Sequence, residues 1–117
     1  MKPVRVILSP EAEEVYNYLN REAATSKVEK SILNAIEKKK ELIKANPHYG
    51  EPVGRNIIPR EYVEKYGITN LFRVELPMFW RMLYTLTNDG SEVEIIVFVL
   101  DIMDHKKYDK TFGYKKH

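Results

Sequence analysis

The sequence predicts an α+β fold in the order βααβββ, with a helical hairpin packed on a small, mainly antiparallel four-stranded sheet. Three observations support this prediction: one strand pattern opens the chain, two amphipathic helix patterns follow it, and three strand patterns separated by turn residues come last. A chain of 117 residues is long enough to bury one hydrophobic core, and no repeat or linker divides it. We therefore expect one domain over residues 1–117.

The first strand and the first helix are adjacent in the sequence. Val4 to Leu8 has the alternating pattern of a strand with at least one buried face. Ser9-Pro10-Glu11 follows it, and this segment places a serine at the cap of a helix and a proline in its first turn. The apolar stripe of this helix consists of Ala12, Val15, Tyr16 and Leu19.

A second helix is predicted from Ser26-Lys27-Val28-Glu29, which has the pattern of a capping box. Asn46-Pro47 ends this helix, because proline cannot continue it. Its expected buried residues are Val28, Ile32, Ala35, Ile36 and Ile43. The lysines at 38–40 and 44 lie in its last turns, where positive charge offsets the helix dipole.

The segment from Pro47 to Pro59 is predicted to be a loop, because it contains three prolines and two glycines. A short helix over Pro59 to Tyr66 follows and ends at Gly67. This loop and short helix carry the chain from the helical hairpin to the sheet.

Three strands complete the predicted sheet, over Leu71 to Leu76, Phe79 to Leu86 and Val93 to Leu100. The Asp-Gly pair within Thr87-Asn88-Asp89-Gly90-Ser91 predicts a tight hairpin before the last strand. That strand is apolar on both faces beyond Glu94, so we expect it at the centre of the sheet, with the helices covering one side.

The composition excludes several classes of protein. Without cysteine, the chain has neither a disulfide framework nor a thiolate zinc site. Its longest apolar run, Ile95 to Leu100, is far shorter than the ~20 residues needed to cross a bilayer. The start Met-Lys-Pro-Val-Arg lacks the apolar stretch of a signal peptide, so we expect a cytoplasmic protein. The 19 basic and 17 acidic residues leave a net charge of +2, so a nucleic-acid site requires local clustering of cations.

The order of these motifs resembles the RelE/ParE superfamily of small bacterial and archaeal toxins from toxin–antitoxin modules. The resemblance is carried by Leu8-Ser9-Pro10-Glu11-Ala12-Glu13, Asn46-Pro47-His48-Tyr49-Gly50, Phe79-Trp80-Arg81-Met82-Leu83-Tyr84 and the tail Asp104-His105-Lys106-Lys107-Tyr108-Asp109 with Phe112-Gly113-Tyr114. It implies either a RelE-type toxin, which enters the ribosomal A site and cuts messenger RNA, or a ParE-type toxin, which poisons DNA gyrase without catalytic residues. Both types imply a separately encoded antitoxin as partner, and neither implies a cofactor.

A RelE-type reaction uses the RNA 2′-hydroxyl as nucleophile. It requires a base near that hydroxyl, positive charge facing the phosphorane-like transition state, and an acid for the departing 5′-oxygen. The chemical types required and the resemblance together select the catalytic candidates Arg81, His105, Lys106 and Tyr108. The RNA-binding candidates are Arg73, Lys107 and Tyr114. No metal site is predicted.

The cationic candidates are expected to meet on one concave face. Arg73, Arg81, Lys106 and Lys107 should converge where the second and third strands meet the tail, and they should give this face the strongest positive potential of the molecule. His105, the histidine inside the matched tail, can take or give a proton near neutral pH.

Each candidate also has a structural interpretation. Strand arginines such as Arg81 often stack on an aromatic ring or pair with a glutamate, and Arg73 has Glu75 two residues away on the same face. A histidine after a strand can simply be solvated, and Lys106-Lys107 can be a solubilising pair.

The tyrosines of the tail have two interpretations as well. Tyr108 and Tyr114 can stack on RNA bases, or each ring can pack on the edge of the sheet; we favour the first for Tyr108 and the second for Tyr114.

Two features depart from the RelE pattern. The net charge is low for a nuclease that binds ribosomes, because neutralisation of phosphates supplies much of such affinity. The predicted helix from Pro59 to Tyr66 is longer than the loop of compact members, so we assign no role to Arg55 or Arg60.

The sequence thus supports a ribosome-dependent mRNA endonuclease as the main hypothesis, with a gyrase inhibitor or a degenerate protein-binding module as alternatives.

Overall fold

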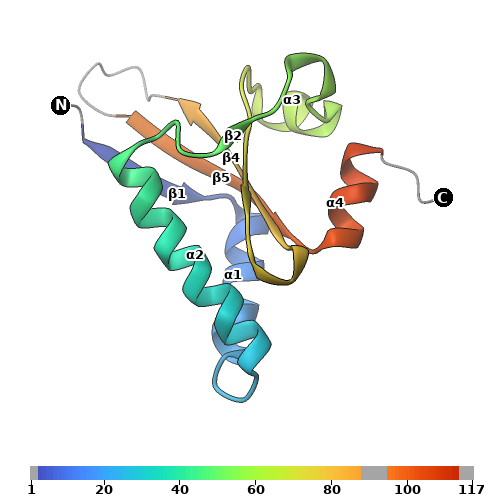
Figure 1. Cartoon of the computed structure of the whole chain (residues 1–117). Helices are drawn as coiled ribbons and strands as arrows, with labels where there is room; N and C mark the ends of the chain where they lie inside the picture. The colour runs from blue at the N-terminus through green and yellow to red at the C-terminus, as the bar shows by residue number, and fades with distance from the viewer. Residues whose placement is uncertain (1–2, 88–94, 114–117) are drawn as a thin grey trace.

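The computed structural model describes residues 3–87 and 95–113 and shows a mixed sheet with a long helical hairpin on one face (Figure 1). The sheet has the order β1-β5-β4-β3-β2. Its strands are β1 (Val4–Leu8), β2 (Glu51–Pro52), β3 (Phe72–Glu75), β4 (Arg81–Thr87) and β5 (Ile95–Met103). β1 pairs with β5 in parallel, and all other neighbours are antiparallel. The structure confirms the predicted α+β class and the order of the four main strands along the chain. It also confirms that the last strand lies inside the sheet and not at its edge.

The fifth strand, β2, lies inside the segment that the sequence predicts to be a loop. It has two residues, and Glu51 pairs with Arg73 at the edge of the sheet. Proline removes a backbone donor, so a strand that contains Pro52 is restricted to an edge. The loop prediction is wrong for these residues because the pattern of so short a strand is hidden between proline and glycine.

The helical hairpin consists of α1 (Pro10–Glu22) and α2 (Lys27–Ala45). Ser9 caps α1 as predicted, since its hydroxyl accepts a hydrogen bond from the Ala12 N–H at 3.0 Å. Ser26 differs from the predicted capping box: its hydroxyl donates to the Glu29 carboxylate and makes no cap bond to the backbone. The tip of the hairpin extends beyond the sheet (Figure 1), which explains why Val28, predicted to be buried, is exposed.

The sheet buries apolar side chains on both faces. The face under α1 and α2 holds the larger core, formed by Ala12, Leu19, Ile32, Ile36, Ile43, Phe72, Val74, Leu76, Met82, Tyr84, Val99 and Ile102. The other face holds a second core, formed by Tyr62, Ile68, Leu71, Leu83, Met103 and Tyr108. Alternation along β4 separates the two sets, because successive side chains of a strand point to opposite faces.

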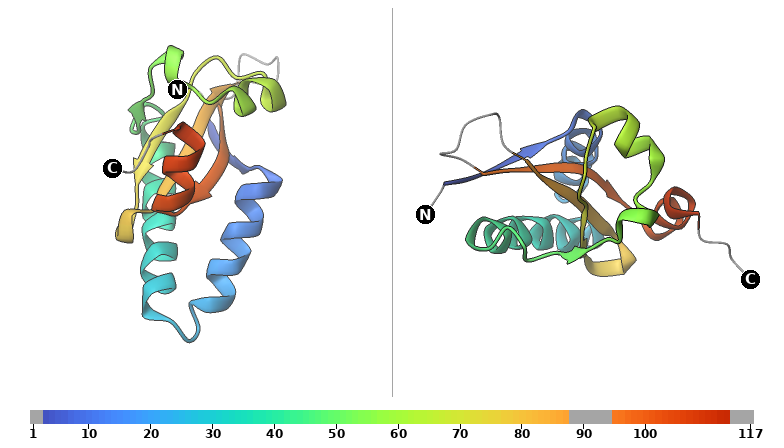
Figure 2. Two further views of the ribbon diagram at one scale, coloured as in Figure 1. Left: turned by 90° about the vertical axis from the view of Figure 1, so that its right-hand side faces the viewer. Right: turned by 90° about the horizontal axis from the view of Figure 1, so that it is seen from above.

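Two short helices cover the second core. α3 (Arg60–Tyr66) matches the predicted short helix to within one residue. α4 (His105–Phe112) occupies the tail, for which the sequence predicted no helix. Asp104 caps α4 by accepting a hydrogen bond from the Lys107 N–H at 2.9 Å, and Gly113 ends it with φ 72°. α2 and α4 lie on opposite sides of β3 and β4 (Figure 2).

A tight turn connects β3 to β4. Residues Pro77–Phe79 form a short 3-10 turn, so β4 begins at Arg81 rather than at Phe79 as predicted. Met78 and Phe79 have positive φ angles of 60° and 63°, which an extended strand does not allow. The predicted hairpin at Asn88-Asp89-Gly90-Ser91 lies outside the described residues.

Tyr84 fixes the loop that follows α2. Its hydroxyl accepts a hydrogen bond from the Gly50 N–H at 2.9 Å and donates to the Pro47 carbonyl at 2.8 Å. A Cβ atom at Gly50 would lie 2.8 Å from this hydroxyl, so glycine is required there by the close approach of the ring. The motif Asn46-Pro47-His48-Tyr49-Gly50 therefore has a structural role.

Candidate functional site

Arg81 and Tyr108 form the centre of the candidate site. Arg81 begins β4 and Tyr108 lies on α4, and the guanidinium carbon is 4.9 Å from the centroid of the tyrosine ring. The guanidinium also donates to the Phe79 carbonyl through Nη1, and its Nε lies 3.5 Å from Glu75. Only 11% of the Arg81 side chain is exposed. Both structural interpretations of Arg81, a stack on an aromatic ring and a pair with a glutamate, are thus present.

Arg73 approaches the same tyrosine from β3. Its Nη1 donates to the Tyr108 hydroxyl at 2.8 Å, and its Nη2 forms an ion pair with Glu51 on β2. The hydrogen bond to Tyr108 is the main cause that raises the pKa of Arg73 above the ordinary value of an arginine. The glutamate that pairs with Arg73 is Glu51, and not Glu75 as the sequence suggested.

Tyr108 is buried between these two arginines. Its side chain belongs to the second core, and the ring of Phe112 lies 4.5 Å away. The predicted role of Tyr108 as a surface on which an RNA base stacks is wrong for this conformation, because the ring faces are covered. The short helix α4 causes this burial, since it turns Tyr108 towards the sheet.

His105 lies at the edge of this cluster and is half-exposed. Its ring centroid is 5.8 Å from that of Phe79, and its Nε2 is 3.3 Å from the Asp109 carboxylate, one turn further along α4. Because the Phe79 carbonyl accepts from Arg81, Phe79 connects the histidine to the arginine. Phe79 thus contacts His105 through its ring and Arg81 through its carbonyl oxygen, and the roles of the two residues stay predictions.

Lys106 and Lys107 do not join this cluster. An α-helix turns by ~100° per residue, so Lys106 projects about 160° around α4 from Tyr108. It lines an open hollow of about 600 Å³ with Lys110 and Glu61. Lys107 lies 3.5 Å from Asp101. The predicted convergence of four cations is wrong: two arginines converge, and both lysines point elsewhere. Tyr114 lies outside the described residues.

The comparison with solved structures gives a match that is informative about the fold. No protein-family model and no curated protein matches the sequence. Among solved structures, the YoeB/ParE toxin from Agrobacterium tumefaciens aligns with a TM-score of 0.58 at 15% sequence identity, and the match covers 86% of this chain and 98% of that chain. The chain has the fold of a YoeB/ParE toxin. A sequence identity of 15% shows that the two proteins share a fold, and it shows nothing about a shared activity.

On this toxin fold, a buried carboxylate that the sequence did not single out lies between α3 and α4. Asp101 on β5 accepts hydrogen bonds from the Tyr62 hydroxyl at 3.2 Å and from the Ile102 N–H at 3.0 Å, and Lys107 lies beside it. Burial raises the pKa of Asp101, although each of these neighbours opposes the shift. Asp101 also raises the pKa of Tyr62, whose own burial is the larger cause. The feature of the sequence that could have indicated this site is Asp101 itself, an acidic residue near the end of the apolar strand β5.

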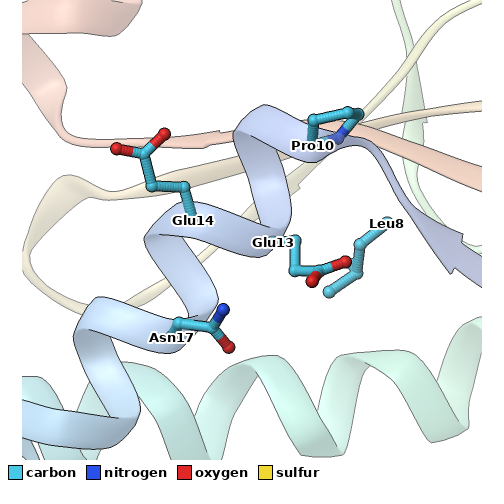
Figure 3. Close-up of a pocket in the computed structure, with 5 residues that line it drawn as sticks. All are labelled: Leu8, Pro10, Glu13, Glu14 and Asn17. Atoms are coloured by element: carbon cyan, nitrogen blue, oxygen red, sulfur yellow. The ribbon is translucent and has the colours of Figure 1, made fainter.

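A second hollow of the toxin fold lies beside the first turns of α1 and is shown in Figure 3. Its volume is about 480 Å³, and it is lined by Leu8, Pro10, Glu13, Glu14 and Asn17. Glu13 points towards Leu8, whereas Glu14 points away from it on the other side of the helix (Figure 3). The charged side chains of this lining are both acidic, so this hollow does not suit a phosphate.

Neither a metal site nor a membrane span emerges from the part of the chain that the structure describes. Within residues 3–87 and 95–113, no three histidine or acidic side chains group together as ligands for a metal ion. Across the same residues, no helix is both long enough and apolar enough to cross a bilayer.

Proposed function

We propose that this protein is the toxin of a toxin–antitoxin module and acts as a ribosome-dependent mRNA endonuclease of the RelE type. The similarity to the fold of the Agrobacterium YoeB/ParE toxin supports the general role. The observation that carries the catalytic part is the contact chain from His105 through Phe79 to Arg81. This chain of contacts supports the proposal, because it links a half-exposed histidine to a cation whose side chain is 11% exposed.

The reaction proposed is cleavage of RNA by its own 2′-hydroxyl. The 2′-oxygen forms a bond to phosphorus as the bond from phosphorus to the 5′-oxygen breaks, and one proton leaves the nucleophile while another reaches the leaving group. His105 is the group proposed to transfer a proton, because it is half-exposed and histidine accepts and donates protons near neutral pH.

Arg81 is the cation proposed to stabilise the phosphorane-like transition state. Its side chain is mostly buried and its partner Glu75 is exposed, so a phosphate must displace this carboxylate to reach the guanidinium. Arg73 stays paired with Glu51 and contributes positive charge from the neighbouring strand. Lys106 and Lys107 point away from this surface, and we assign them to contacts with the phosphate backbone of the ribosome rather than to the reacting atoms.

The proposed partner is a separately encoded antitoxin that keeps the toxin inactive until it is removed. Without it, the toxin reaches the ribosome and cuts the message during translation.

A second candidate function is protein binding by a toxin fold that has no nuclease activity. The observation that favours it is the neutralisation of both site arginines: Arg73 pairs with Glu51, and Arg81 lies beside Glu75. An anionic substrate must then compete with carboxylates that are already in place.

Expression of the chain without an antitoxin tests these candidates. The nuclease predicts growth arrest and cuts within translated messages, mapped by primer extension. His105→Gln should restore growth, whereas His48→Gln, which changes an exposed histidine outside the cluster, should not. Growth arrest with DNA breaks and intact messages would support the gyrase inhibitor instead. Normal growth would support the protein-binding module.

A further inference from the structure

The turn between β3 and β4 exposes two large apolar side chains. Met78 and Phe79 are 62% and 69% exposed, and no other large hydrophobic residue in the part of the chain that the structure describes is as exposed. Neither residue contributes to the hydrophobic cores. Exposed apolar groups that a fold does not need for its own stability commonly mark a binding surface.

The backbone of this turn holds both side chains outward. Met78 and Phe79 have φ angles of 60° and 63°, a left-handed conformation that residues other than glycine seldom adopt. The turn is fixed at its base, where the Leu76 N–H donates to the Trp80 carbonyl at 2.9 Å and Trp80 packs against the larger core. Arg81 fixes it from the other side through the Phe79 carbonyl. Strained residues held in this way cluster at functional sites.

The surroundings of Phe79 differ from those of a simple apolar patch. Its ring lies 5.8 Å from the His105 ring at an interplanar angle of 53°, and the Arg81 guanidinium lies behind its carbonyl. An exposed aromatic face therefore stands beside a titratable group and a cation. A nucleotide has matching parts: a flat base that stacks on aromatic rings, a ribose and a charged phosphate.

We propose that Phe79 is a positioning residue that stacks on a base of the single-stranded message and so holds the adjoining ribose and phosphate against His105. This inference rests on the proposed nuclease function and adds the residue that orients its substrate. It transfers to Phe79 the stacking role that Tyr108 cannot fill, because the Tyr108 ring is buried.

Single-turnover cleavage of messages on programmed ribosomes tests this proposal with variants of Phe79. Phe79→Ala and Phe79→Leu should raise the toxin concentration for half-maximal rate by roughly 5- to 150-fold, the range for loss of one stacked base. Phe79→Trp should keep the wild-type concentration for half-maximal rate, because tryptophan supplies an aromatic face. The pH profile should not change, since His105 remains. Met78→Ala is the matched control from the same turn and should cleave at the wild-type concentration.

Leucine is the decisive variant, because it keeps apolar area but lacks a ring face. If Phe79→Leu cleaves like the wild type, the contact is apolar rather than stacking, and the proposal is overturned. Circular dichroism melts of each variant should match the wild type, because the side chain is exposed. If Phe79→Leu melts early, Phe79→Ala is compared with Phe79→Trp instead, and equal half-maximal concentrations for these two variants overturn the proposal.

A binding experiment separates failure of this proposal from failure of the nuclease function. The full chain is titrated into fluorescently labelled, uncleavable 2′-O-methyl oligoribonucleotides, with or without an abasic position, and anisotropy is recorded. The base-containing strand should bind the wild type more tightly than the abasic strand, and Phe79→Leu should remove this difference. If the wild-type protein cuts no message but binds the base-containing strand more tightly than the abasic strand, the nuclease function is contradicted and the stacking role is supported. Equal affinity for both strands, or no binding at all, would overturn the stacking role.

Discussion

Arg73 donates a hydrogen bond from Nη1 to the Tyr108 hydroxyl at 2.8 Å, across 35 residues of sequence. This bond joins β3 to α4 and helps to keep the tyrosine ring between two guanidinium groups. Since α4 also carries His105, the position of the histidine depends on how Tyr108 holds this helix.

Tyr108→Phe should lower the free energy of unfolding by about 1–2 kcal/mol, because it removes a hydrogen bond to a charged donor that is only partly exposed. Urea denaturation followed by circular dichroism measures the change. Tyr18→Phe is the control, since Tyr18 is exposed and should show almost no effect. Equal stability of Tyr108→Phe and the wild type would show that water replaces the hydroxyl at no cost.

Leu83→Ala should lower the free energy of unfolding by ~2–5 kcal/mol, because Leu83 is fully buried in the second core and its truncation leaves a cavity. Arg81→Ala should cost less than about 2 kcal/mol, the upper range for an arginine stacked on an aromatic ring. Both variants should lose toxicity, but only Leu83→Ala through loss of stability. If denaturation gives the same cost for both, Arg81 has a structural role and its assignment to the phosphate is wrong.

His105→Gln should slow cleavage on programmed ribosomes by ~10²–10⁴-fold, the usual effect of removing a positioned acid or base. Binding to the ribosome should change little, because the variant keeps a polar side chain of similar length. The dependence of the wild-type rate on pH near neutrality should flatten in the variant. A variant that cuts at the wild-type rate with an unchanged profile would exclude His105 from proton transfer.

Asp101 should make the free energy of unfolding depend on pH. Its pKa is raised by burial, so the folded protein holds this proton at higher pH than the unfolded chain does. The contribution of Asp101 is therefore fully present below the unfolded pKa of about 4 and is lost as the pH rises through the folded value. Asp101→Asn removes this titration.

The measurement for Asp101 is urea unfolding of the wild type and Asp101→Asn at pH 4 and pH 7. The difference in free energy of unfolding, wild type minus variant, should be larger at pH 4. The hydrogen bond from Tyr62 favours the charged carboxylate, so it reduces this difference between the two pH values but does not reverse it. A difference that grows towards pH 7 would show that Lys107 outweighs burial.

The sequence by itself determined the helical hairpin and the order of the main strands. These features follow from short-range rules: Ser9 and Pro10 start α1, Pro47 follows α2, and the apolar run of β5 requires a central place in the sheet. The motif around Arg81 and the tail also contain two residues that Phe79 connects in the structure, Arg81 and His105, whose roles stay predictions.

Only the tertiary structure decided which members of the tail face the site. The sequence places Lys106 beside His105, but α4 rotates each successive residue by ~100°, which directs Lys106 outward and Tyr108 inward. Eight largely polar residues do not reveal a helix by their pattern, because the helix depends on packing of Tyr108 and Phe112 against the sheet. The exposure of Phe79 likewise depends on a turn whose residue Trp80 packs against the larger core. The sequence thus determines which chemical groups are present, and packing determines which of them can meet a substrate.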